Sequence, residues 1–160
     1  DPTKPATGLI PYQPIAQFWS DGADKTRHLA VPDDTKITIG ADQDWDLPVG
    51  SVLMKEFSLG GRRVETRLLM HHNDGTWAGY TYEWNDAQTD ATLLTDGKTK
   101  TVGTQTWTYP SQGQCMTCHQ GAAGGGRRWP AVPPPAHARQ VHPRRGQAGA
   151  AGEAQVQRRR

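Results

Sequence analysis

The sequence predicts a mainly β protein, an antiparallel meander folded into a small sandwich or half-barrel. Between residues 8 and 110, short runs of apolar and β-branched residues alternate with turn residues. No helical pattern of convincing length precedes the two cysteines near residue 115. Hydrophobic residues make up only 34% of the 160 residues, and 18 Gly and 12 Pro are present. This composition is typical of a polar, turn-rich domain.

The expected strands follow one another at short intervals. In chain order they cover residues 35–39, 52–59, 63–71, 77–84, 91–94 and 104–109. Gly60-Gly61 and Asn73-Asp74-Gly75 supply the tight turns between the second, third and fourth of them. Alternation predicts two sets of side chains that each share a face: Val64, Thr66, Leu68 and Met70 on one strand, and Tyr80, Tyr82 and Trp84 on the next.

Charge divides the chain into two kinds of sequence. The formal net charge is +2, but residues 1–119 carry 10 Lys+Arg and 15 Asp+Glu, whereas residues 120–160 carry 8 Arg and one Glu. We therefore expect a β-rich domain over 1–110, a segment 111–124 that carries the cysteines, and a disordered basic tail over 125–160. No stretch approaches the roughly 20 apolar residues that span a membrane.

The most specific chemical signal is Cys115-Met116-Thr117-Cys118-His119. These are the only two cysteines of the chain, and a histidine follows the second directly. The C-x-x-C-H spacing attaches c-type haem. Each thiol adds across one vinyl group of the porphyrin to form a thioether, and the histidine then lies under the ring as the proximal iron ligand. The motif predicts haem c bound by Cys115 and Cys118, with His119 on the iron.

Three other uses of these cysteines compete. A redox dithiol usually opens a helix in a βαβ unit, whereas a polar turn precedes Cys115. A zinc finger with His137 and His142 would need an unusually long central gap, and Pro133-Pro134-Pro135 interrupts its helix. A structural disulfide over two residues would close a small, strained loop of little entropic benefit. The haem interpretation is favoured over all three.

Other candidate groups have simpler explanations. Asp42, Asp44 and Asp46 alternate, but the glycine and terminal glutamate of a calcium loop are absent, so a solvated loop is favoured. His71 and His72 are adjacent, which points them to opposite faces of a strand, and we expect two surface histidines near a turn. Five tryptophans are expected in the core or shielding a haem: Trp19, Trp45, Trp77, Trp84 and Trp107. No phosphate loop, Ser/His/Asp set or paired-carboxylate motif stands out.

Several ordered blocks resemble a family of bacterial, largely uncharacterised dihaem c-type cytochromes. The blocks cover residues 8–12, 18–25, 45–50, 64–69, 79–85, 88–91 and 114–119. In that family a β-rich segment precedes the first C-x-x-C-H, and some members lie near or are fused to domains similar to quinoprotein sugar dehydrogenases. The resemblance extends over about residues 8–120. It implies an exported electron-transfer protein, with Cys115 and Cys118 as thioether sites and His119 as axial ligand.

Two departures from the family concern the C-terminal part. The family carries a second haem motif, and this chain has none. Residues 121–160 contain 7 Gly, 9 Ala, 8 Arg and 5 Pro, the residues that GC-rich codons encode. The composition suggests an out-of-frame translation beginning near Gly125; the alternative is a genuine basic tail that binds acidic partners or a membrane surface.

The sixth iron ligand stays open at this stage. No methionine follows the motif, Met54 and Met70 lie in expected strands, and His137 and His142 lie in the tail.

We expect a c-type cytochrome, or part of one, that transfers electrons in the bacterial periplasm rather than catalysing a reaction of its own. Its partner would be a redox protein such as a quinoprotein dehydrogenase, with no nucleic acid involved. The first residues, Asp1-Pro2, read as those of a mature protein or a fragment. The alternatives are a dithiol oxidoreductase and a non-catalytic β-sandwich binding module.

Overall fold

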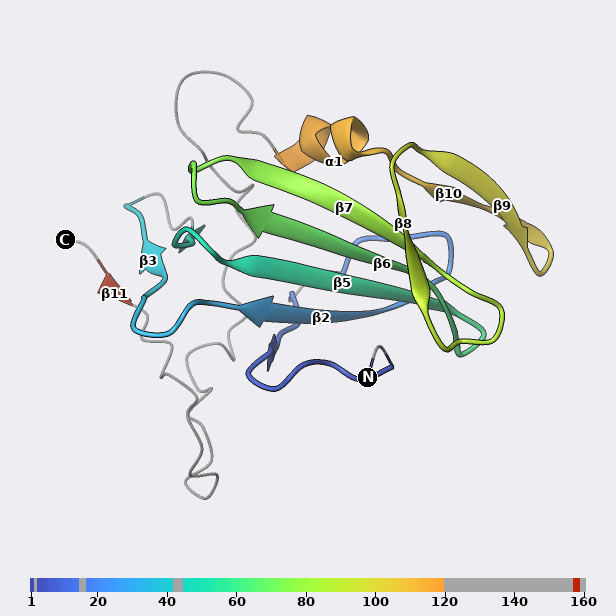
Figure 1. Cartoon of the computed structure of the whole chain (residues 1–160), viewed down its shortest axis with the longest axis horizontal. Helices are drawn as coiled ribbons and strands as arrows, with labels where there is room; N and C mark the ends of the chain where they lie inside the picture. The colour runs from blue at the N-terminus through green and yellow to red at the C-terminus, as the bar shows by residue number, and fades with distance from the viewer. Residues whose placement is uncertain (2, 15–16, 42–44, 120–156, 159–160) are drawn as a thin grey trace.

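A computed structural model describes residues 1, 3–14, 17–41, 45–119 and 157–158. These residues form strands and one helix (Figure 1). The elements are β1 (Ile10–Pro11), β2 (Asp24–Ala30), β3 (Thr38–Ile39), β4 (Trp45–Asp46), β5 (Val52–Leu59), β6 (Arg62–His71), β7 (Trp77–Trp84), β8 (Ala91–Leu94), β9 (Lys98–Val102), β10 (Gln105–Tyr109), α1 (Gln112–His119) and β11 (Gln157–Arg158).

A six-stranded antiparallel sheet in the order β1-β2-β5-β6-β7-β8 forms the centre of the fold. The turn between β5 and β6 needs backbone that only glycine adopts easily, because Gly60 and Gly61 have φ values of 56° and 78°. Two smaller groups complete the fold: the hairpin β9–β10, and a three-stranded group in the order β11-β3-β4. The predicted mainly antiparallel β class is confirmed.

The two faces of the central sheet have different neighbours. One face, called the inner face here, carries Phe57, Arg67, Leu69 and Gly79 and is covered at one end by the hairpin β9–β10. Phe57 packs there with Trp107 and Tyr109, which are only 3% and 1% exposed. At the other end of the sheet, a second cluster joins Leu29 and Leu53 to residues around β3 and β4. Alternation places Met54, Leu68 and Tyr80 on the opposite, outer face.

A β-bulge changes the face that Val64 uses. Phe57 pairs with Glu65 and Ser58 with Arg63, so Val64 is the extra residue in β6. Val64 therefore packs into the inner cluster with Phe57 and Trp107. The expectation that it shares a face with Thr66 is wrong for this reason. The predicted face of Tyr80, Tyr82 and Trp84 agrees with the register, and the Trp84 indole donates a 2.9 Å hydrogen bond to Thr66 Oγ1.

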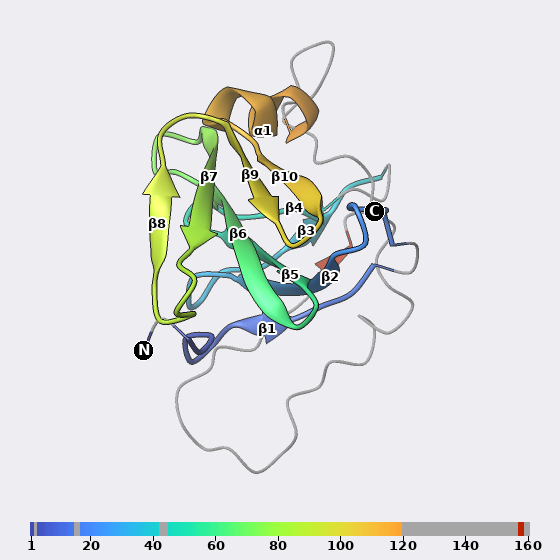
Figure 2. The ribbon, with the colours of Figure 1, turned by 90° about the vertical axis from the view of Figure 1, so that its right-hand side faces the viewer.

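The helix α1 follows the buried end of β10 after two residues and packs against β7. Figures 1 and 2 show it next to β7 and adjoining the hairpin β9–β10. A capping box starts the helix: Ser111 Oγ accepts from the Gln114 amide at 3.3 Å, and the Gln114 side chain accepts from the Ser111 amide at 2.8 Å. The polar segment before Cys115, expected to be a turn, is thus the first turn of a helix.

The predicted strands over 52–59, 77–84 and 91–94 agree with β5, β7 and β8, and 63–71 and 104–109 each differ from the structure by one residue. The run 35–39 is reduced to β3 at Thr38–Ile39. Two longer strands, β2 and β9, were not expected.

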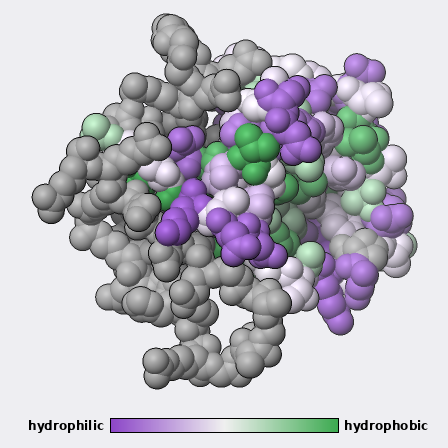
Figure 3. Space-filling view, turned by 60° about the vertical axis from the view of Figure 1, so that its left-hand side comes forward, coloured by the Kyte–Doolittle hydropathy of each residue, from purple (hydrophilic) through white to green (hydrophobic). Residues whose placement is uncertain are grey.

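Within the described ranges, no helix has the length and apolar character needed to cross a membrane. Figure 3 shows small hydrophobic patches among hydrophilic residues on the face that it views.

Candidate functional site at helix α1

The helix α1 carries the whole C-x-x-C-H motif. Cys115 is the fourth residue of the helix and His119 the last, and both are partly buried. His119 is four positions after Cys115, which places the two residues one turn apart on the same side of the helix. Cys118 lies on the same helix, and its side chain is outside the described part of the structure. The motif therefore occupies regular backbone that holds its first and last residues in a fixed relation.

Cys115 packs against β7 at Gly79, a strand position where only glycine fits. A Cβ built on Gly79 would lie 2.5 Å from Cys115 Cβ and 3.1 Å from its Sγ, well inside normal contact distance. Gly79 therefore sets how closely α1 approaches the sheet. This is the usual meaning of a glycine inside a strand, close approach of another piece of backbone. The role of Gly79 is not visible in the sequence, where it is one glycine among 18.

A buried threonine fastens the same helix to the sheet. Thr81, two residues after Gly79 and only 2% exposed, donates a 3.0 Å hydrogen bond from Oγ1 to the carbonyl of Pro110. Burial raises the pKa of the Cys115 thiol, while Arg67 and a hydrogen bond with Thr81 offset part of the rise. The thiol is consequently protonated at neutral pH and is a weak nucleophile by itself.

His119 lies in a cationic environment. Burial lowers the pKa of its imidazole, and the positive charges of Lys55 and Arg67 lower it further. The imidazole is therefore kept neutral near pH 7, and the neutral form is the one that ligates a metal. Lys55 and Arg67 belong to β5 and β6, so the last turn of α1 faces the inner face of the sheet.

A row of cations crosses the inner face beside this helix. Arg27, Lys55 and Arg67 are successive register partners on β2, β5 and β6. Like charges directly opposite one another in a sheet are destabilising. Burial, Arg27, Arg67 and Lys25 together lower the pKa of Lys55 to about 8, and Glu65 opposes them. Sequence reasoning missed this row because only the pairing register brings the three side chains together.

Glu65 is the buried acid of the inner face and has no exposed surface. It accepts a 3.0 Å hydrogen bond from Arg67 Nη2, a shorter one from Arg67 Nε, and a 2.9 Å bond from the indole of Trp107. The hairpin β9–β10 is thereby tied to β6. One carboxylate thus compensates one of the three cations in the row.

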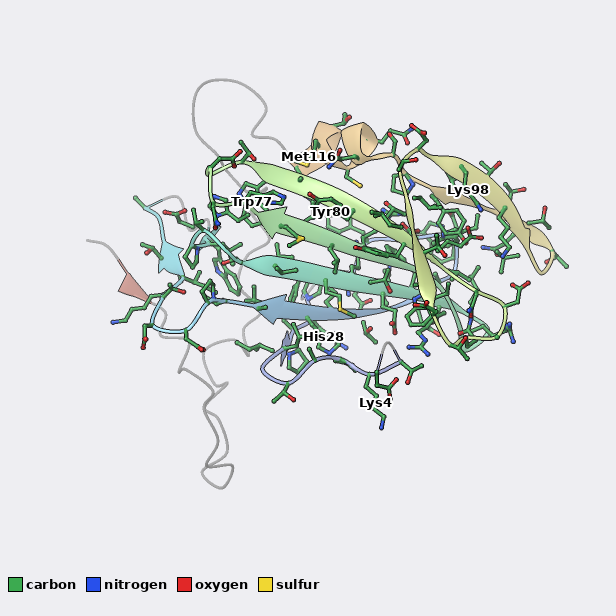
Figure 4. The ribbon with its side chains drawn as sticks, viewed as in Figure 1. Lys4, His28, Trp77, Tyr80, Lys98 and Met116 are labelled. Atoms are coloured by element: carbon green, nitrogen blue, oxygen red, sulfur yellow. The ribbon has the colours of Figure 1, made fainter. Side chains whose placement is uncertain are left out.

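A pocket of about 410 Å³ opens between the first turns of α1 and the start of β7. Its lining comprises Trp77, Ala78, Gln112, Gly113, Met116 and Thr117. Figure 4 labels two of these residues, Met116 on α1 and Trp77 at the start of β7. The pocket is shared between polar and apolar groups and lies beside the cysteine motif.

The histidines of the β6 end are not the surface pair that the sequence predicted. His71 is buried, stacks on Trp77 with ring centres 4.6 Å apart, and places Nδ1 3.0 Å from the carbonyl oxygen of Leu47. The adjacent loop of Leu47 covers the strand end, which explains the burial. His72 Nε2 lies 3.0 Å from the Tyr80 hydroxyl. The expectation that they point to opposite faces is in keeping with their different neighbours.

None of the residues considered as a sixth iron ligand is placed beside α1 by the described part of the structure. Met54 and Met70 alternate with inner-face residues and lie on the outer face, away from α1. His137 and His142 lie outside the described residues, as does all of the tail 125–160 except residues 157–158. Of the three aspartates expected in a solvated loop, Asp42 and Asp44 are also outside the described residues, and Asp46 lies in β4. Among the residues that are described, no group of three or more His, Cys, Asp and Glu is arranged to hold a metal ion.

Comparison with family models, with curated proteins and with solved structures gave no match to this chain. The functional assignment therefore depends on the motif, its helix and the surrounding sheet.

Proposed function

We propose that the chain is a c-type cytochrome, or a segment of one, that carries electrons outside the bacterial cytoplasm. Haem c would be attached through Cys115 and Cys118, and His119 would be the proximal iron ligand. The observation that carries the proposal is the single C-x-x-C-H motif on one helix, with Cys115 and His119 on its sheet-facing side.

The residues present fit haem c in their chemistry. His119 is held in the neutral form that ligates iron. Arg27 is 6% exposed, and its Nη1 has no hydrogen-bond partner within the described ranges, so this buried cation could pair with a carboxylate of the porphyrin. In the structure the Cys115 thiol packs on β7, and a thioether bond would replace its contact with Thr81.

The bound group would supply one-electron chemistry, the exchange of ferrous and ferric iron. The chain supplies the surroundings. His119 would ligate the iron, and the packing of α1 on the sheet would limit the access of water to this partly buried residue. The axial ligand and the burial of the site are the features by which a protein sets the reduction potential.

The rival function is a dithiol oxidoreductase, and two observations count against it. A reactive dithiol near a helix N-terminus has a lowered thiol pKa, whereas burial raises the pKa of Cys115, the fourth residue of α1. The strand before the helix, β10, belongs to an antiparallel hairpin and not to a βαβ unit. The finer proposals follow from the resemblance: export to the periplasm, and a redox partner such as a quinoprotein dehydrogenase.

The test is covalent haem retention in the full chain, expressed with haem-maturation machinery. We expect haem to stay with the protein after acid–acetone extraction, and a pyridine haemochrome spectrum of c type. The double variant Cys115→Ala, Cys118→Ala should abolish covalent retention of haem. His72→Ala, in the turn between β6 and β7, should leave it unchanged. Haem that is extracted from the parent protein would refute the proposal and leave the dithiol alternative, which a thiol titration would then address.

A further inference from the structure

The row formed by Arg27, Lys55 and Arg67 holds more positive charge than the fold balances. Arg67 is paired with Glu65 through two hydrogen bonds. Lys55 Nζ lies 5.2 Å from the centre of the Phe57 ring and forms no ion pair within the described residues. The neighbouring Lys25 is engaged by neutral groups, the Phe18 carbonyl and Ser20 Oγ. Two cations, Arg27 and Lys55, therefore lack an ion-pair partner in the described part of the chain.

Arg27 is the stronger indication of a missing anion. It is more than nine-tenths buried, and Nη1 is out of contact with solvent and has no hydrogen-bond partner among the residues that the structure describes. Its neighbour Tyr12 is a phenol whose pKa burial raises, so it supplies no negative charge at neutral pH. An unpaired buried charge is strongly destabilising. Nothing in the apolar cluster around Leu29 and Leu53 requires a guanidinium at this position.

The position of the row relates it to the motif on α1. Lys55 and Arg67 act electrostatically on His119, and Arg67 also acts on Cys115. Arg27 is the direct register partner of Lys55 on the next strand. The two unbalanced cations thus lie on the sheet face that α1 covers, extending away from β7 and Gly79.

We propose that Arg27 and Lys55 bind carboxylate groups, and that in the haem-bearing protein these are the two propionates of haem c. The two negative charges of the propionates match the two cations that lack a partner. A guanidinium suits a carboxylate because it presents two parallel donors. This inference rests on the proposed function, since it requires that haem be attached at Cys115 and Cys118.

The test compares Lys55→Met in the full chain with and without attached haem. In the protein without haem, removing one of the crowded cations should raise the thermal unfolding midpoint by about 3 °C or more. In the haem-bearing protein the same variant should lower the midpoint by a similar amount, because a propionate loses its partner. Lys36→Met, at an exposed site, is the matched control and should change neither midpoint by more than about 1 °C.

The outcomes separate the inference from the function on which it rests. A midpoint that rises in both forms, or falls in both forms, overturns propionate binding while covalent haem stands. Arg27→Met should show the same reversal; if it fails to fold without haem, Lys55→Met decides alone. If no haem is attached, the apo protein is titrated with glutarate at constant ionic strength. If glutarate raises the thermal unfolding midpoint of the parent and not that of Lys55→Met, the row binds free dicarboxylates. If glutarate changes the midpoints of the two proteins equally, the carboxylate site is overturned.

Discussion

The two ends of the inner face of the central sheet treat charge in opposite ways. Beneath the hairpin β9–β10, Glu65 meets Arg67 and Trp107, and Glu83 meets Lys98 and Lys100. Beside α1, Arg27 and Lys55 have no such partners among the described residues. In the first region, acids of the chain balance the cations. In the second, the described residues supply too little negative charge, which is the pattern expected where a ligand forms part of the interior.

The largest effect is expected beneath the hairpin β9–β10, where Glu65 balances a buried cation. Glu65→Ala would leave the Arg67 guanidinium and the Trp107 indole without their buried acceptor. We expect a loss of about 3–5 kcal/mol in the free energy of unfolding, measured by urea denaturation with fluorescence detection. Glu56→Ala is the control, because Glu56 pairs with Arg63 at 3.9 Å near the surface. It should cost less than about 1 kcal/mol. Equal losses for the two variants would mean that the buried network does not hold the hairpin.

A smaller effect is expected where α1 meets β7. Gly79→Ala places a Cβ 2.5 Å from Cys115 Cβ, and the helix must shift to relieve the contact. We expect a loss of about 1–3 kcal/mol in denaturant unfolding, together with a lower yield of covalently attached haem. Gly113→Ala, in the first turn of α1, meets no atom within 4 Å. This control should be neutral or stabilise by up to about 1 kcal/mol. A Gly79→Ala protein as stable as the parent would show that α1 does not pack closely on β7.

The smallest effect is a pH dependence of stability that Lys55 causes in the region beside α1. Lys55 is faced by Arg27, Arg67, Lys25 and Glu65, and its pKa falls from 10.5 to about 8. Between these values the unfolded chain binds more protons than the folded one, so this group makes stability rise with pH. In the protein without haem, the advantage of Lys55→Met over the parent should therefore shrink between about pH 8 and 10.5. Urea midpoints across that range measure it. An advantage that is independent of pH would contradict the lowered pKa.

The sequence allows the strands with strong alternation and clear turns to be predicted. β5 and β7 agree to the residue because glycine-containing turns bound them and their apolar positions alternate. β2 was missed because Lys25, Arg27 and His28 make it look like a polar loop, and only its place between β1 and β5 makes it a strand. The helix α1 was missed although Ser111-x-x-Gln114 is a capping-box signal that could have revealed it.

The proposed chemistry of the site follows from the sequence, whereas its surroundings do not. Cys115, Cys118 and His119 are adjacent in the sequence, so their spacing alone indicates the chemistry. Gly79 and Arg27 become part of the site only through pairing across several strands and the docking of α1. A bulge at Val64 further shifts which side chains reach the inner face, and no local pattern in the sequence marks it.

The short connection between β10 and α1 determines how firmly the first turn of the helix is held. Tyr109 is held by a hydrogen bond from its hydroxyl to the Val64 carbonyl, and Pro110 by Thr81. The start of α1 is therefore fixed to the sheet through the two residues that precede Ser111. Because opening of the first helical turn has to work against these bonds, we expect the Gln114 and Cys115 amides, which bond to Ser111, to exchange slowly with solvent.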